Sequence, residues 1–119
     1  GKLDDDIFKL TDMIVNNNKK EAVKLLKDQL ELGSNEIYLL TMIVRQFRIL
    51  IQLKSVNSFD AAKILKLHPF VVQKSLPMVR KYSMEQLKDI YRKLLEIDLK
   101  LKSSKVSGET LLETFILEI

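Results

Sequence analysis

The feature that most constrains the fold is a run of 17 residues, Ile37 to Leu53, whose side chains are almost all apolar. Only Gln46 interrupts the apolar side. The other polar residues recur at steps of four, three and four, so on a helix they form one narrow stripe: Thr41, Arg45, Arg48 and Gln52. A helix that is apolar around most of its circumference is stable in water only when other helices surround it. The run therefore predicts a long central helix inside a core.

A membrane-spanning helix is the alternative for such a run. It would need about 20 apolar residues, and each arginine near its middle would cost about 3 kcal/mol on insertion into a bilayer. The run is shorter than that and carries Arg45 and Arg48 close to its centre. The sequence therefore favours a core helix and predicts no contact with a membrane.

The length and composition of the chain predict a single domain. With 119 residues, of which 46% are hydrophobic and 30% charged, the chain is large enough for one core and too small for two. Cysteine is absent, which excludes disulfides and thiolate metal sites. The first residues, GKLDDDIF, are acidic where a targeting segment would be basic and then apolar, so the sequence predicts a cytoplasmic protein.

Amphipathic helices are predicted ahead of the central one. An acidic first turn, Asp4 to Asp6, precedes apolar residues at helical spacing, and this helix should end in the asparagine run 16–18. Asn18 can cap a second helix, which should stop at Gly33 because glycine readily adopts the left-handed conformation that ends helices. Ser34 and Asn35 both offer caps for the central helix. The short link between the second and the central helix predicts that these two pack as neighbours.

After the central helix the sequence predicts two short helices, of which Ser58 can cap the first. The residue before a proline is pushed out of helical geometry, while proline itself suits a first turn. One helix should therefore end before His68, and the next should begin at Pro69. Pro77 lies inside this second helix, where we expect a kink or an early end. Four of its apolar residues are expected to face the core: Val71, Val72, Leu76 and Val79.

Two further helices complete the chain. Ser83 with Gln86 three residues later forms a capping box, and apolar residues then recur at steps of three and four as far as Leu101, so this helix should be long. Ser103 to Gly108 is a polar connection, and residues 111–116 supply a last apolar face. No segment alternates with the two-residue period of a strand. The prediction is an all-α fold, a single compact bundle of about six or seven helices around the long central one.

Few residues could carry chemistry. Glycine occurs only at positions 1, 33 and 108, so no glycine-rich loop can bring backbone N–H groups around a phosphate. His68 is the one histidine, and no serine or carboxylate is spaced around it in a catalytic pattern. Carboxylate-bridged metal sites in helical bundles need Glu-x-x-His pairs, and the sequence has none. We therefore expect no enzymatic activity, no metal and no cofactor.

The charge is unevenly distributed along the chain. Residues 1–40 carry six basic and eight acidic side chains, whereas 41–119 carry fourteen and eight. A solvated, lysine-rich surface accounts for an excess this modest. DNA is the other candidate partner, because the two short helices within 58–82 could form a helix-turn-helix DNA-binding domain. Against it, the turn lacks glycine and Pro77 would disturb the helix meant for the groove.

Three stretches, taken in order, resemble the C-terminal domain of the bacterial DNA polymerase III delta subunit. They are Arg45-Gln46-Phe47-Arg48 in the long apolar helix, Leu67-His68-Pro69-Phe70-Val71-Val72 at the turn, and Asp98-Leu99-Lys100-Leu101-Lys102 in the long amphipathic helix. The polar connection and the closing LLETFILEI also fit, and IFKLTDMIVNNNKKEAVKLL resembles the passage out of that subunit's middle domain. Two features depart from the family: Pro77, and serine at 103 and 104, where glycine is frequent.

The resemblance implies a non-catalytic assembly domain. In that family the domain joins the matching domains of gamma or tau and delta prime in a collar. The collar holds together the clamp loader, which loads the sliding clamp onto DNA during replication. The clamp would be contacted only through N-terminal domains of the AAA ATPase type that lack a working P-loop and are absent from this sequence, and DNA only weakly or indirectly. We expect residues 1–119 to form one domain, with 1–17 as the passage from the preceding one.

The resemblance also supplies candidate residues. One set would lie at a subunit interface, where the arginines can pair with acidic groups of this domain or of a neighbour: Arg45, Arg48, Asp98 and Lys102. A second set would have structural roles: Phe47, His68, Pro69 and Phe70.

Overall fold

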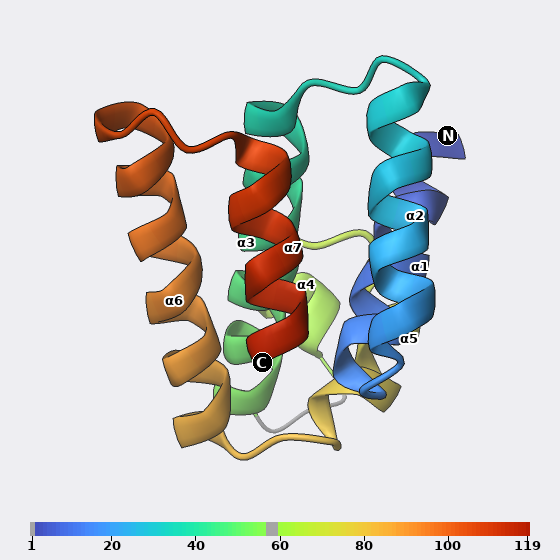
Figure 1. Cartoon of the computed structure of the whole chain (residues 1–119). Helices are drawn as coiled ribbons and strands as arrows, with labels where there is room; N and C mark the ends of the chain where they lie inside the picture. Colours follow the sequence, from blue (N-terminus) through green and yellow to red (C-terminus); the bar gives the residue numbers. More distant parts are fainter. Residues whose placement is uncertain (1, 57–59) are drawn as a thin grey trace.

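The computed structural model describes residues 2–56 and 60–119, and within these ranges the chain forms helices and no strand. The predicted all-α bundle is confirmed. Its helices pack into a body of 44 × 29 × 24 Å (Figure 1). In chain order they are α1 (Lys2–Val15), α2 (Lys19–Glu31), α3 (Glu36–Ser55), α4 (Ala61–Leu65), α5 (Pro69–Val79), α6 (Met84–Ser103) and α7 (Gly108–Glu118).

The central position of α3 is as its apolar run predicts. It contacts α1, α5, α6 and α7. In Figure 1 α7 lies in front of α3, and α6 runs antiparallel beside it. Phe47, at the middle of α3, is fully buried. The apolar side of α3 supplies much of the core: Leu39, Leu40, Ile43, Phe47, Ile49, Leu50 and Leu53.

The ends of α1 and α2 are set by residues in the left-handed conformation, Asn17 (φ 60°) and Gly33 (φ 93°). After α2, the N–H of Gly33 donates to the carbonyl of Leu30 at 3.0 Å, and the N–H of Ser34 donates to that of Gln29 at 3.1 Å. These two bonds satisfy carbonyls that the helix end would otherwise leave without a partner. The predicted stop at Gly33 is thereby confirmed.

The packing of α2 differs from the prediction. Its main contacts are with α1 and with α7, so the short link to α3 does not make these two helices packed neighbours. Lys19, at the start of α2, donates through Nζ to the carbonyl of Leu117 in α7 at 2.7 Å. The reason is that the apolar face of α2, with Ala22 and Leu26 fully buried, turns toward α1 and α7.

Two of the predicted caps, Asn35 and Ser83, make capping hydrogen bonds. Asn35 Oδ1 accepts from the N–H groups of Ile37 and Tyr38 at 2.8 and 3.2 Å. The capping box is present, since Ser83 Oγ accepts from the Gln86 N–H while Gln86 Oε1 accepts from the Ser83 N–H. Asn18 occupies the cap position of α2, but its side chain makes no capping hydrogen bond. The predicted cap Ser58 lies outside the described residues.

The inward face of α5 differs from the prediction in part. Val79 is buried and Val71 and Val72 pack against the core as predicted, but Leu76 is exposed, while Ser75 and Met78 are buried. The cause is a polar contact across the core, because Gln46 Nε2 of α3 donates to Ser75 Oγ at 3.1 Å. This bond satisfies the one polar residue on the apolar side of α3 and turns α5 so that Ser75 faces inward. The early end expected at Pro77 is observed, since α5 ends at Val79.

No helix in the described part of the chain is long and apolar enough to cross a membrane.

Candidate interaction surface

One strip of α3 reaches solvent, and it carries the polar stripe seen in the sequence. Thr41, Arg45 and Arg48 are exposed and Gln52 is half-buried. Arg48 Nε donates to the hydroxyl of Tyr91 at 3.4 Å, which places this edge of the strip against α6. Within residues 2–56 and 60–119, neither arginine forms an ion pair. Both guanidinium groups are therefore available to acidic groups of another molecule.

The helix α6 continues this surface. Because it runs antiparallel to α3 (Figure 1), the residues that follow Tyr91 at helical spacing lie on the same side. Asp98 and Lys102 are two of them, joined by an ion pair of 3.0 Å between Oδ2 and Nζ. Such an exposed pair contributes only about 0.3 to 0.5 kcal/mol to stability. Leu95 and Leu99 stand beside them, 43% and 66% exposed.

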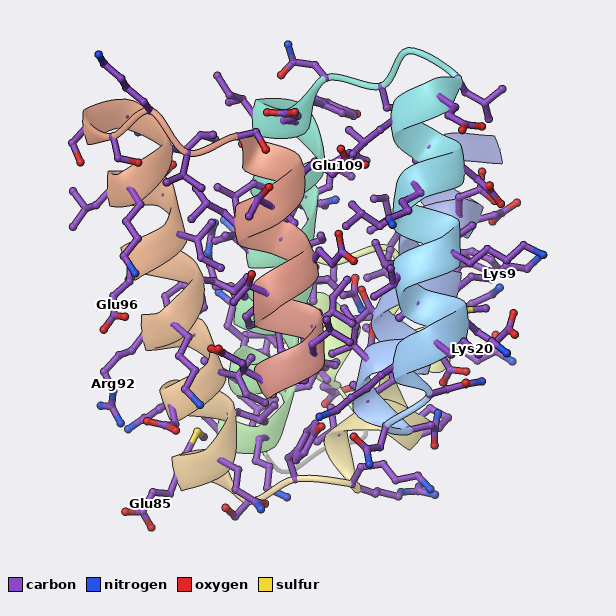
Figure 2. The ribbon with its side chains drawn as sticks, viewed as in Figure 1. Lys9, Lys20, Glu85, Arg92, Glu96 and Glu109 are labelled. Carbon is purple, nitrogen blue, oxygen red and sulfur yellow. The ribbon has the colours of Figure 1, made fainter. Side chains whose placement is uncertain are left out.

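The predicted interface residues therefore fall on two adjacent helices. We define the α3–α6 face as Thr41, Arg45, Arg48, Tyr91, Leu95, Asp98, Leu99 and Lys102. Figure 2 shows Arg92 and Glu96 extending outward from α6, so charged residues border the apolar part of this face. Exposed leucines beside arginine and tyrosine, with charges around them, form a composition typical of protein interfaces.

The residues predicted to be structural lie in two places. Phe47 is in the core, whereas the other three form the start of α5. His68 caps α5, with Nδ1 accepting from the Phe70 N–H at 3.1 Å, and Pro69 is the first helical residue. Phe70 is not a core residue, because 45% of it is exposed.

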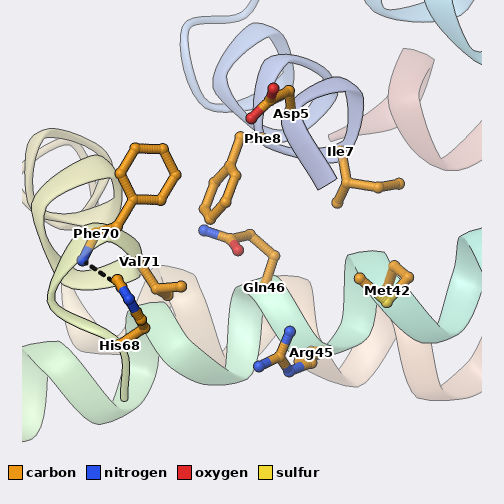
Figure 3. Close-up of a pocket in the computed structure, with 9 residues that line it drawn as sticks. All are labelled: Asp5, Ile7, Phe8, Met42, Arg45, Gln46, His68, Phe70 and Val71. Atoms are coloured by element: carbon orange, nitrogen blue, oxygen red, sulfur yellow. Dashed lines mark hydrogen bonds between the residues drawn. The ribbon is translucent and has the colours of Figure 1, made fainter. Parts of the chain in front are cut away.

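A cavity of about 370 Å³ opens between α1, α3 and α5, on the side of the α3 strip away from α6. Figure 3 shows three groups of lining residues, from α1, from α3 and from the start of α5. They are Asp5, Ile7 and Phe8, then Met42, Arg45 and Gln46, then His68, Phe70 and Val71. Arg45 thus lies at the border between this α1–α3–α5 cavity and the α3–α6 face.

The ionisable groups give little sign of catalytic chemistry. Among the described residues no three His, Cys, Asp or Glu side chains lie close enough to hold a metal ion. Burial raises the pKa of the Tyr82 hydroxyl above its ordinary value of 10.0, and that phenol packs against the core rather than lining the cavity.

Comparison with known proteins shows the family of this domain. Residues 4–119 match the family described as the DNA polymerase III delta subunit, C-terminal domain. The chain belongs to this family. A relative, DNA polymerase III subunit delta of Bacillus subtilis (strain 168), is 31% identical over 122 residues, which cover 98% of this chain and 35% of that protein.

A solved structure gives the same family. The Bacillus subtilis DNA clamp loader delta protein matches 98% of this chain and 36% of its own, with a TM-score of 0.89 and 31% identity. The chain therefore spans about a third of the length of the delta proteins that it matches. At that identity the likeness covers sequence as well as fold, and the resemblance inferred from the three short stretches is confirmed.

In this delta C-terminal domain, α4 and α5 occupy the place where a helix-turn-helix motif was considered. The first of them has only five residues, and α5 packs one side against α3 and α1. The five basic residues of 60–81 are all exposed: Lys63, Lys66, Lys74, Arg80 and Lys81.

No prediction from the sequence placed Leu95, Leu99 or Phe8 on a surface. Leu95 and Leu99 fall off the apolar face that runs through Leu87, Ile90 and Leu94, and that offset is the signal that could have found them. The pairing of Phe8 with Phe70 joins residues far apart in the chain and leaves no local pattern.

Proposed function

We propose that this chain is a non-catalytic assembly domain of a clamp loader, and that its α3–α6 face packs against the matching domains of gamma or tau and delta prime. The assembled complex would load the sliding clamp onto DNA during replication in the bacterial cytoplasm. In this proposal residues 1–119 are one domain, entered through 1–17 from a preceding domain that contacts the clamp. The domain itself binds no nucleotide and no metal.

The observation that carries the proposal is the exposed strip on the most enclosed helix. A central helix contributes most to the core when it is covered on every side, yet α3 presents Arg45 and Arg48 to solvent without an acidic partner in the described residues. Exposed Leu95 and Leu99 lie beside them on α6. Arginine and apolar side chains together are enriched where proteins meet, and a neighbour can cover both.

The test is assembly with the proposed partners. Mixing this chain with the collar domains of gamma or tau and delta prime should give a complex on size-exclusion chromatography. Replacing Arg45 and Arg48 by alanine should weaken it by at least about tenfold, because removing charge-assisted bonds at an interface costs about 1.4 kcal/mol or more. Replacing Arg80 and Lys81 by alanine removes the same charge from the turn that follows α5, and should leave assembly unchanged.

Two outcomes would count against this function. One is a complex that is equally sensitive to both pairs of substitutions, which would mean that only net charge matters. The other is sub-micromolar, sequence-selective binding of duplex DNA that is lost when Lys74, Arg80 and Lys81 are neutralised. If these residues contact phosphates, each one removed should lower the salt slope of binding by about one unit. We expect duplex DNA to bind weakly and without sequence preference.

A further inference from the structure

The α1–α3–α5 cavity has an aromatic wall built from two helices. The rings of Phe8 and Phe70 meet edge to face, with centroids 6.3 Å apart and planes at 89°. Lys74 Nζ lies 5.8 Å from the centroid of the first ring and 5.3 Å from that of the second. The ammonium group is attracted to the faces of both rings, which favours this arrangement. The wall is therefore preformed, although Phe70 remains 45% exposed.

The cavity is lined by two charged side chains that have no ion-pair or hydrogen-bond partner among the described residues. Arg45 lines it from α3 and Asp5 from α1 (Figure 3). Neither forms an ion pair or a hydrogen bond with another described residue. Counting Lys74 at the aromatic wall, two cations stand here against one carboxylate. A ligand that approaches the aromatic wall therefore meets a surplus of positive charge.

The volume of the cavity and the residues that line it indicate what kind of ligand it can bind. Its volume of about 370 Å³ is near the lower end for ligand sites, which accommodates one bulky side chain. Five of the lining residues are apolar and can contact such a side chain: Phe8, Phe70, Ile7, Val71 and Met42. His68 adds a ring nitrogen at the rim, because its Nδ1 is already occupied by the Phe70 N–H and its Nε2 is not.

We propose that this cavity binds a peptide segment of another protein, in which an acidic residue stands next to a bulky apolar one. The apolar side chain covers Phe70 and Phe8, and the carboxylate meets Arg45 and Lys74. This inference does not depend on assembly through the α3–α6 face, and it can be tested on the chain alone.

The probe is a short capped peptide, acetyl-Gly-Asp-Phe-Asp-Gly-amide. Added to the isotope-labelled chain, it should shift the backbone amide NMR signals of Phe8, Gln46 and Phe70, with a Kd of about 1 mM or tighter. A matched peptide with asparagine in place of both aspartates should bind about tenfold more weakly, since it keeps the shape and loses the charge-assisted bonds. A peptide with alanine in place of phenylalanine should not shift these signals.

The protein variants follow the same design. Arg45→Gln should weaken binding of the acidic peptide by about tenfold while leaving the neutral peptide unaffected. Arg92→Gln is the matched control, because Arg92 points outward from α6 and does not line the cavity (Figure 2). Both arginines are exposed, so neither change should disturb folding, and the dispersion of the amide spectrum checks this.

Four results would overturn the proposal. They are the absence of shifts at the cavity, equal affinity for the acidic and neutral peptides, undiminished binding of the alanine peptide, and shifts at the same amides produced by a short single-stranded DNA at lower concentration than by the peptide.

Discussion

Glu36 and Gly108 join the first turns of α3 and α7, although 72 residues separate them in the chain. The N–H of Gly108 donates to Glu36 Oε2 at 2.9 Å. A Cβ atom at position 108 would clash with that oxygen and would lie 2.8 Å from Glu36 Cβ. Glycine is therefore required here by close approach rather than by backbone conformation.

This contact predicts that Gly108→Ala destabilises the protein when the Glu36 side chain is present and does not when it is absent. Gly108→Ala should lower the free energy of unfolding by about 1 to 3 kcal/mol, because the clash outweighs the better helix propensity of alanine. In a Glu36→Gly background the clashing side chain is gone, and the same substitution should be neutral or stabilising. Urea denaturation of the four proteins measures both differences. Equal destabilisation in the two backgrounds would rule out the Glu36 contact as the cause.

At the scale of the helix, two asparagines occupy cap positions but only one of them makes capping bonds. Asn35→Ala should cost about 1 kcal/mol of stability, since two N–H groups at the start of α3 lose their acceptor. Asn18→Ala is the matched control and should change stability by less than about 0.5 kcal/mol, because its side chain makes no cap bond. Thermal denaturation followed by circular dichroism compares them, and an equal loss for both would show that bonding geometry is not what matters.

The sequence predicted the helices better than their orientation. Local signals such as the capping box at Ser83 and the stop at Gly33 depend on neighbouring residues, so they could be read directly. The inward face of α5 could not, because the exposed Leu76 and buried Ser75 are decided by Gln46, a residue 29 positions away from its serine partner. The partner of α2 is likewise set by long-range packing.

At the scale of the whole molecule, Phe47 lies where the helices meet. Phe47→Ala should cost about 3 to 5 kcal/mol, because the side chain is fully buried and its removal leaves a cavity in the core. Phe70→Ala removes the same atoms from a half-exposed position and should cost clearly less. Urea titrations report both values. A midpoint unchanged by Phe47→Ala would contradict the central placement of α3.

The candidate site was predictable only in part. The stripe containing Arg45 and Arg48 is periodic, so the sequence indicated one exposed side of a buried helix. What lies beside the stripe is a product of tertiary packing: Tyr91 and the exposed leucines on one side, and the cavity with its aromatic wall on the other. The spacing of residues within one helix cannot show which residues of other helices lie beside it.

The bond between Lys19 and Leu117 spans 98 residues, and the contact of α2 with α7 that surrounds it closes almost the whole chain into a loop. The entropy of closing a loop grows only logarithmically with its length, by about 0.6 kcal/mol for each doubling. Contacts between residues distant in sequence nevertheless slow the search for the native state. The seam between α2 and α7 therefore costs the bundle little more stability than a seam between nearer segments would, but it slows the folding of the bundle.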